Sequence, residues 1–344
     1  MNPILYSLAK RFLFCMSPET AHEFTLSALR TADKLHLCSL IGGRRVSDPV
    51  TVMGLNFPNR VGLAAGMDKQ ANTFPAFGHL GFGFVEVGTL TPRPQPGNPK
   101  PRCFRCIPQQ AIINHMGINN PGIEVGVANI RAAKGFSGVL GINISKNEST
   151  PNDEARMDYL TCLREAWPVA DYITINFSCP NVPHLCELAR ADSAADLLAA
   201  LKSEQANLSS ETGRHVPIVM KVSPDMSESQ IRELSGVFLD CQLDGLICTN
   251  TTTSREGVEG HPAAAQKGGL SGKPLYNKAN ETLEAFASHL KGRIPIIGVG
   301  GIMSADDAEA KIRAGASLVQ LYSGFIFKGP QLIRDCAVRL RDMR

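Results

Sequence analysis

The segment DYITINFSCPN, residues 171–181, joins a hydrophobic run to a short polar stretch. Its first half, Tyr172 to Ile175, consists of β-branched and aromatic residues that favour a buried strand. Pro180 has no backbone N–H, so regular structure ends soon after that strand. The polar half places two amides, a hydroxyl and a thiol at the carboxyl end of the strand. Because α/β proteins carry their active sites at strand ends, this segment is the first candidate for chemistry.

The composition is typical of a globular protein with little net charge. With 344 residues, 43% of them hydrophobic, the chain can bury one large α/β core with an appendage, or two domains. A net charge of only +3 argues against nucleic-acid binding. The ten cysteines lack a disulfide-framework spacing, and neither a secretory signal nor a membrane-spanning apolar run is visible. We therefore expect a reducing, cytoplasmic compartment.

Cys103 and Cys106 form a C-x-x-C pair, which is typical of metal and redox sites. A zinc site needs a second pair or histidines at comparable spacing, and the sequence has neither. We therefore expect no metal.

Strand-like and helix-like segments alternate after a small hairpin at residues 50–57, which turns at Met53-Gly54. Helical stretches such as 192–207 and 226–239 fill the gaps between the strands. Eight such alternations predict the α/β class and a parallel (β/α)8 TIM barrel, with an open doubly wound sheet as the alternative. The expected strands lie at about 60–65, 83–88, 139–143, 171–176, 217–222, 244–248, 295–299 and 317–321.

Residues 1–45 form an N-terminal helical extension to a barrel domain that we place at 46–344. Apolar residues recur at helical spacing in two short segments, and Ser17-Pro18-Glu19 is a helix start with a serine N-cap. This part carries six basic and three acidic residues, 6 − 3 = +3, which is the whole net charge. It is either a helical hairpin packed on the barrel or a basic amphipathic element for an anionic membrane surface.

Polar residues or glycines follow every predicted strand, which is the pattern of the active face of a barrel. Gly300-Gly301 and Ser323-Gly324 suit a phosphate after strands seven and eight. Lys69 and Lys221 stand at strand ends, where a buried lysine requires an anionic partner. The abundant amides suit a flat heterocycle with many donors and acceptors.

The chain resembles the dihydroorotate dehydrogenases, and in particular their class 2, quinone-dependent branch. The motifs that carry the resemblance run in order over nearly the whole chain. They include SPETAHEF (17–24), GLAAGMDK (62–69), NHMGINN (114–120), GINISKN (141–147), INFSCPN (175–181), MKVSPD (220–225), TNTT (249–252), PIIGVGGI (295–302) and QLYSGFIFKGP (320–330).

The resemblance implies FMN as cofactor and oxidation of (S)-dihydroorotate to orotate, with Cys179 as the catalytic base. The implied cofactor-binding residues are Ala65, Gly66, Lys69, Thr89, Asn143, Asn176, Lys221, Thr249, Gly272, Gly301, Tyr322 and Ser323. The implied substrate-binding residues are Lys69, Asn114, His115, Met116, Gly117, Ile118, Asn176, Asn181, Asn250 and Thr251.

The resemblance also implies that the extension forms an apolar tunnel for a membrane quinone, with His22 and Arg105 along it. It places the protein in pyrimidine (UMP) biosynthesis, as a peripheral enzyme on the cytoplasmic face of a bacterial cell membrane. We expect a monomer.

Cys179 departs from the class 2 pattern, which has serine at the base position; cysteine is the residue of the soluble class 1 enzymes. A free thiol has a pKa of about 8.5 and loses its proton far more easily than a hydroxyl. His115 and Ile118 also depart from the residues common in relatives. Two alternatives follow: a class 1-type enzyme with a soluble acceptor or partner subunit, and a non-catalytic flavin-binding barrel.

Overall fold

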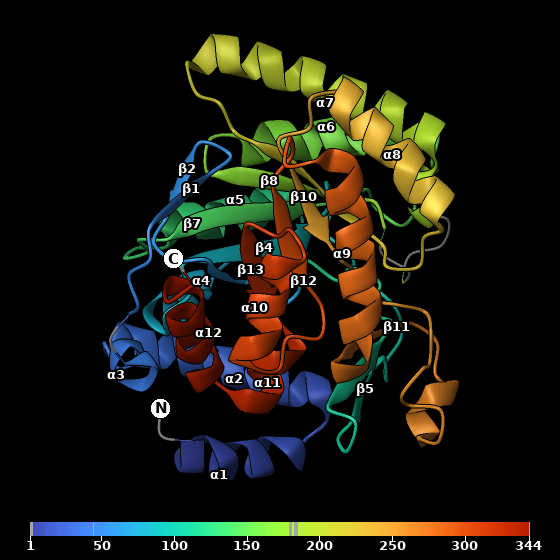
Figure 1. Cartoon of the computed structure of the whole chain (residues 1–344). Helices are drawn as coiled ribbons and strands as arrows, with labels where there is room; N and C mark the ends of the chain where they lie inside the picture. The colour runs from blue at the N-terminus through green and yellow to red at the C-terminus, as the bar shows by residue number, and fades with distance from the viewer. Residues whose placement is uncertain (1–2, 44, 179–180, 182–184, 344) are drawn as a thin grey trace.

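Eight parallel strands close into a barrel with helices on its outside, as Figure 1 shows for the computed structural model. The structure describes residues 3–43, 45–178, 181 and 185–343. Each barrel strand pairs with the next along the chain, and the last pairs with the first, so the sheet has no free edge. The strands are β3 (Val61–Leu63), β4 (Phe84–Leu90), β7 (Val139–Ile144), β8 (Tyr172–Asn176), β9 (Ile218–Val222), β10 (Gly245–Cys248), β12 (Ile296–Val299) and β13 (Leu318–Leu321).

Both faces of the barrel strands are buried and largely apolar, with polar side chains at a few inward positions such as Glu86 and Asn143. The hairpin β1 (Val50–Val52) and β2 (Leu55–Phe57) contributes Val52 and Phe57 to the inner cluster. The Phe57 ring meets that of Phe84 edge to face at 5.2 Å, so the hairpin closes the end where β4 begins. The outward residues of the strands pack against the helices in a larger cluster.

Helices follow the strands and cover the barrel (Figure 1). The capping box of α8, in which Ser227 and Gln230 exchange hydrogen bonds, shows how local sequence sets one helix start. The helices are α4 (Phe74–His79), α5 (Ile123–Ala132), α6 (Ala155–Ala166), α7 (Ala191–Thr212), α8 (Glu228–Asp240), α9 (Tyr276–Leu290), α10 (Ala305–Arg313), α11 (Ser323–Lys328) and α12 (Gln331–Arg341). Short 3-10 helices are η1 (Leu185–Ala189), η2 (Pro262–Ala265) and η3 (Lys273–Leu275).

The N-terminal extension contains α1 (Pro3–Phe14), α2 (Pro18–Lys34) and α3 (Cys38–Gly42). The Ser17 hydroxyl accepts a hydrogen bond from the backbone N–H of Thr20, which confirms the predicted start of α2. The third helix was not predicted, because five residues are too few for a helical period to show. Within the described residues, no helix combines the length and apolar content needed to cross a bilayer.

A separate three-stranded antiparallel sheet lies beside the barrel and was also not predicted. It consists of β5 (Cys103–Cys106), β6 (Ala111–Asn114) and β11 (Gly269–Gly272), in the order β11-β6-β5. Cys103 and Cys106 pack in different apolar clusters, so their side chains point apart. Among the described residues, no group of His, Cys, Asp and Glu is arranged to hold a metal ion.

The TIM barrel is thereby confirmed and the open sheet is excluded. All eight predicted strands, the hairpin at 50–57 and the helices predicted at 192–207 and 226–239 are present, with bounds shifted by a few residues.

Candidate active site

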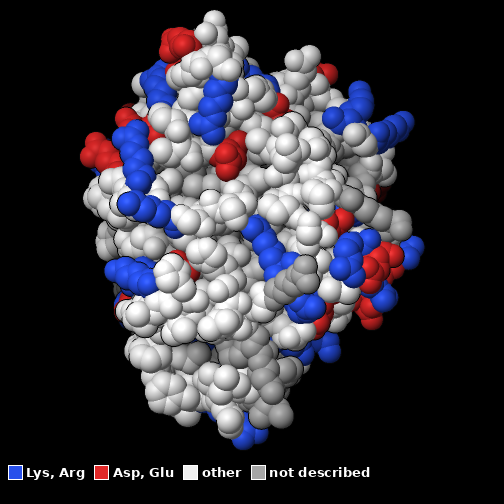
Figure 2. Space-filling view, turned by 90° about the vertical axis from the view of Figure 1, so that its left-hand side faces the viewer, with Lys and Arg blue, Asp and Glu red and all other residues white. Residues whose placement is uncertain are grey.

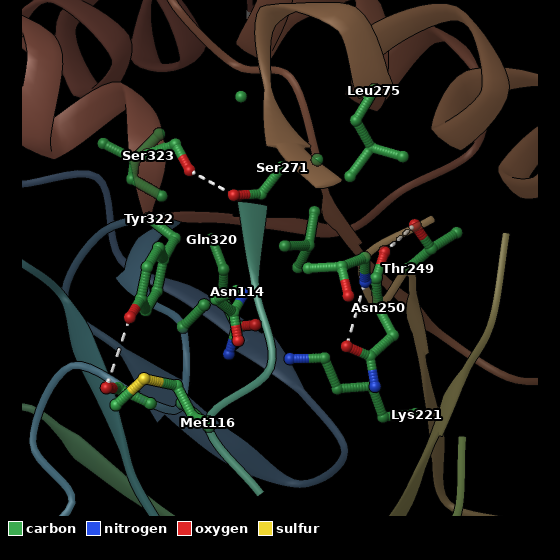
Figure 3. A pocket seen from close by; sticks show the side chains of 18 of the residues that line it. Asn114, Met116, Lys221, Thr249, Asn250, Ser271, Leu275, Gln320, Tyr322 and Ser323 are labelled. Carbon is green, nitrogen blue, oxygen red and sulfur yellow. Dashed lines mark hydrogen bonds between the residues drawn. The ribbon is translucent and has the colours of Figure 1, made fainter. Parts of the chain in front are cut away.

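A cavity opens at the carboxyl ends of the barrel strands (Figure 3). It contains about 1040 Å³ of space, part of it open to solvent. The wall is built from residues that lie on different elements but meet at one end of the barrel, as expected for the active face of this fold. Residues at or just beyond seven of the barrel strands line it, namely Ala65, Thr89, Asn176, Lys221, Thr249, Val299 and Gln320.

One side of the cavity is formed by hydroxyl groups and closely approaching backbone. The Ser271 and Ser323 hydroxyl oxygens lie 2.8 Å apart, and Figure 3 shows both at the cavity edge. Gly301 has a φ of 78°, and a Cβ at this position would lie 2.3 Å from Cα of Tyr276. Only glycine fits there, and it leaves backbone exposed to a ligand. This side offers hydroxyls and backbone to an anion such as a phosphate.

A continuous line of hydrogen bonds runs from the opposite side of the cavity into the barrel. We call it the polar chain; each member donates to the next. Asn250 Nδ2 donates to Asn176 Oδ1 (3.3 Å), and Asn176 Nδ2 donates to the Thr89 hydroxyl (3.3 Å). The Thr89 hydroxyl donates to Asn143 Oδ1 (2.6 Å), and Asn143 Nδ2 donates to Glu86 Oε1 (2.8 Å).

Two lysines add positive charge to the cavity wall. Lys221 is only 7% exposed, and its side chain extends into the cavity in Figure 3. Burial lowers the pKa of Lys69, and the nearby Cys103 and Glu19 oppose that shift. An anionic ligand beside these ammonium groups would offset the cost of burying them.

Four cavity-lining oxygens are buried without a hydrogen-bond partner in the described part of the chain. They belong to amide or hydroxyl groups and point to ligands with several hydrogen-bond donors. They are Asn119 Oδ1, Asn181 Oδ1, Thr251 Oγ1 and Gln320 Oε1.

After β8, the residues Ser178 and Asn181, which lie on either side of the predicted base in the sequence, form hydrogen bonds with neighbouring segments. The Ser178 hydroxyl donates to the carbonyl of Lys221 and accepts from Asn250 Nδ2 (3.5 Å). Asn181 Nδ2 donates to Asn114 Oδ1 (3.0 Å). Cys179 itself lies outside the described residues, so its role stays a prediction.

Most of the residues assigned from the sequence come together in this cavity. The predicted cofactor residues line it except Asn143, which lies behind Thr89 in the polar chain. Of the predicted substrate residues, His115 and Gly117 are not at the wall, whereas their neighbours Met116 and Ile118 are. The His115 ring instead stacks on Phe104, with centroids 5.9 Å apart.

The sequence-based assignment missed several wall residues, of which Gln320, Asn119 and Ser271 are polar. Gln320 could have been found from strand alternation, because it stands two residues before Tyr322 on the inward side of β13. Asn119 and Ser271 lie in segments whose place at the cavity depends on the small sheet, which was not predicted.

One of the two predicted tunnel residues, Arg105, lies on the small sheet where that sheet contacts the extension, and the other, His22, is in α2 of the extension. Arg105 in β5 donates to the Met16 carbonyl (2.8 Å), and its guanidinium lies 4.6 Å from the centroid of the Phe14 ring. Burial, with a smaller contribution from Lys69, lowers the pKa of His22 to about 3. An apolar cluster of Phe14, Cys103, Ile112, Met303, Ile326 and Phe327 lies at the same junction.

Comparisons with known proteins agree with this architecture. The family model described as dihydroorotate dehydrogenase matches residues 49–343. A dihydroorotate dehydrogenase (quinone) of Akkermansia muciniphila is 65% identical over 341 residues, covering 99% of this chain and 98% of that protein. One from Cellvibrio japonicus is 52% identical, covering 97% of each chain. The crystal structure of DHODH from Eimeria tenella in complex with ferulenol matches with a TM-score of 0.84 and 35% identity, covering 95% of this chain and 91% of that chain.

Proposed function

The chain belongs to the dihydroorotate dehydrogenase family, and from this premise we propose how it works as a quinone-dependent enzyme. It oxidises (S)-dihydroorotate to orotate in pyrimidine biosynthesis and passes the electrons to a membrane quinone. The observation that carries the proposal is a cavity at the active face with two lysines and four unpartnered buried oxygens.

The cavity fits FMN. The hydroxyl and glycine side (Gly272, Gly301, Tyr322, Ser323) would hold its phosphate, and Ala65, Gly66, Thr89, Asn176, Lys221 and Thr249 would surround its ring and chain. The Tyr322 hydroxyl already donates to the Gly66 carbonyl (3.3 Å), which joins the two groups of residues. When bound, FMN would supply the two-electron acceptor that no side chain provides.

Cys179 acts as the general base toward dihydroorotate. Its thiolate takes a proton from the substrate carbon and becomes the thiol. The described neighbours Ser178 and Asn181 are each held by hydrogen bonds. Lys69 binds the substrate carboxylate, while Asn114, Asn250 and Thr251 bind the ring edges. Thr251 Oγ1 and Asn181 Oδ1 lack partners in the described structure and are free for ring N–H groups.

The extension delivers the quinone. Of the ten large apolar side chains that are exposed in the described part of the chain, seven lie in the extension: Leu5, Leu8, Phe12, Phe24, Leu35, Leu37 and Leu40. Among the described residues in the lowest part of the surface in Figure 2, the end where Figure 1 places α1, most are uncharged, a basic side chain shows at the bottom edge, and no acidic side chain is in view. We infer that this face binds peripherally to the cytoplasmic side of the cell membrane, that the quinone passes His22 and Arg105, and that the protein acts as a monomer.

A soluble acceptor is the competing possibility, and the cysteine at position 179 is the feature that favours it. The discriminating experiment is an anaerobic titration of the purified flavoprotein with dihydroorotate, followed by fumarate, NAD or quinone as oxidant. We expect bleaching by dihydroorotate and rapid reoxidation by quinone alone. Reoxidation by fumarate or NAD would overturn the quinone assignment, and absence of bleaching would leave a non-catalytic flavin-binding barrel.

A further inference from the structure

A buried carboxylate, that of Glu86, lies beneath the residues that line the cavity. Glu86 is in β4, points into the barrel and has no exposed surface. Three donors converge on it: Asn143 Nδ2 at 2.8 Å, the Tyr172 hydroxyl at 3.1 Å and Gln320 Nε2 at 2.9 Å. An ionised carboxylate is an acceptor only, so all three bonds point the same way.

The space for this arrangement is created by Gly141 in the neighbouring strand β7. A Cβ on Gly141 would lie 2.2 Å from the Tyr172 ring, so only glycine allows that ring inside the barrel. Burial and the adjacent Glu86 raise the pKa of Tyr172 far above its ordinary value. The hydroxyl therefore stays protonated and remains a donor to Glu86.

The carboxylate determines the direction of the polar chain. Because Asn143 must use its Nδ2 for Glu86, its Oδ1 faces Thr89 and receives the Thr89 hydroxyl proton. Thr89 then has only lone pairs left, so Asn176 must turn its Nδ2 toward it. That leaves Asn176 Oδ1 to accept from Asn250 at the cavity wall. Without an acceptor-only group at the end, each amide could face either way.

The same carboxylate orients a second amide. Gln320 uses Nε2 for Glu86, so its Oε1 is turned away from the carboxylate, and this oxygen is buried without a partner in the described structure. Gln320 lines the cavity, and an acceptor left open there requires a donor on the ligand.

We propose that Glu86 is a positioning residue that sets which cavity groups donate and which accept. Through Asn143, Thr89 and Asn176 it fixes the amide of Asn250 toward the substrate, and through Gln320 it presents an acceptor to the cofactor. The inference rests on the proposed function, because orotate and FMN are the ligands whose pattern it would match.

A charge-transposition cycle on the full-length flavoprotein tests the proposal. Glu86→Gln puts a group that can either donate or accept at the inner end of the polar chain, so the chain no longer has a fixed direction. Asn143→Asp places two carboxylates, both acceptors, face to face. In the double variant Glu86→Gln/Asn143→Asp, the introduced glutamine donates to the introduced aspartate and accepts from Tyr172 and Gln320, while the aspartate still accepts from Thr89. The carboxylate has moved by one link, and the polar chain above Thr89 keeps its direction.

The measurements are the orotate dissociation constant, from the change in flavin absorbance, and the fraction of FMN retained after dialysis. We expect each single variant to bind orotate about tenfold more weakly, because buried mispaired groups are costly. The double variant should recover most of that loss. Tyr172→Phe is the control, since it removes one donor to Glu86 but leaves both amides anchored, and its orotate affinity should stay close to wild type.

A variant that folds poorly would also bind orotate weakly. The thermal midpoint and FMN retention of the double variant are therefore compared with those of each single variant. A double variant no better than its weaker parent, or a Glu86→Gln variant that binds orotate like wild type, overturns the proposal. Wild-type protein that binds neither FMN nor orotate would instead overturn the proposed function.

Discussion

In the barrel, polar side chains lie inside and bind one another, whereas in the extension they contact the barrel and the large apolar side chains face outward. Glu86 and Asn143 are wholly buried within the polar chain. In α2, Asp33 lies 2.6 Å from His79 Nδ1, and Arg30 donates to Asn72 and Thr73. Leu5, Leu8 and Phe12 on α1 are 59%, 57% and 58% exposed.

This difference in where the polar and apolar side chains lie indicates that the barrel interior and the extension bind different kinds of partner. A hydrogen-bonded interior gives one fixed arrangement and suits recognition of a polar molecule. The helices of the extension contact the barrel through polar groups and expose apolar side chains. Such an exposed apolar face suits binding to an apolar surface outside the chain, such as a membrane. Substitutions in the barrel should therefore act mainly on the reaction with dihydroorotate, and substitutions in the extension mainly on quinone reduction and membrane binding.

The largest effect is expected inside the barrel, at the base. Cys179→Ala should slow flavin reduction by dihydroorotate by about 10³-fold, because general base catalysis contributes roughly 10²–10⁴-fold. In stopped-flow experiments across pH, Cys179→Ser should reach its plateau at higher pH than the wild type. Wild-type rates in the alanine variant would show that another group takes the proton.

Removing residues 1–40 is the corresponding change in the extension. Quinone reduction should fall by about 10²-fold or more, as expected when a substrate is no longer positioned. Flavin reduction by dihydroorotate should persist, because the cavity lies in the barrel. A truncated protein that still turns over with quinone would contradict the tunnel role, and FMN retention serves as the control for an intact barrel.

Acid should destabilise the protein through the extension. The His22 pKa is about 3 in the folded protein, lowered by burial and Lys69, against about 6.5 when unfolded. Between these values the unfolded chain binds a proton that the folded chain does not, so stability is lost as pH falls. From pH 7 to pH 5 this amounts to about 2 kcal/mol.

Thermal unfolding across pH checks this loss. A His22→Gln variant should lack the His22 contribution, and its unfolding midpoint should fall less between pH 7 and pH 5. Equal slopes for variant and wild type would mean that His22 is protonated without cost in the folded state.

The smallest effect on stability is expected at the outer face of α1. Replacing Leu5, Leu8 and Phe12 by serine should change the free energy of unfolding by less than about 0.5 kcal/mol per substitution, because these side chains are more than half exposed. Binding to phospholipid vesicles in a flotation assay should be lost. In the matched control, serine replaces Val125 and Met157, which are 47% and 58% exposed on barrel helices. This control variant should float with the vesicles as the wild type does.

The barrel could be predicted because its strands are apolar runs that each stop at polar or glycine residues. Tyr172 to Asn176 is the clearest case, since burial on both faces requires an unbroken run. The cavity wall followed from the same rule together with the family motifs.

The small sheet could not be predicted, because β11 is Gly-Leu-Ser-Gly, which has no strand period, and its partner β6 lies far away in sequence. Gln320 was missed because Leu318 to Leu321 resembles an ordinary buried strand. Glu86 carried a signal, a carboxylate inside an apolar strand, but its partners lie on three other strands.

The sheet β11-β6-β5 makes the two ends of the molecule parts of one mechanical unit. Gly272 of β11 lies at the cavity and pairs with Ala111, and β6 passes this pairing on to β5, where Arg105 contacts the extension. A ligand that immobilises the cavity end also stiffens the strand against which α1 rests. Amide exchange in β5 should therefore slow when orotate binds, and occupancy at one substrate's site should be felt at the other's.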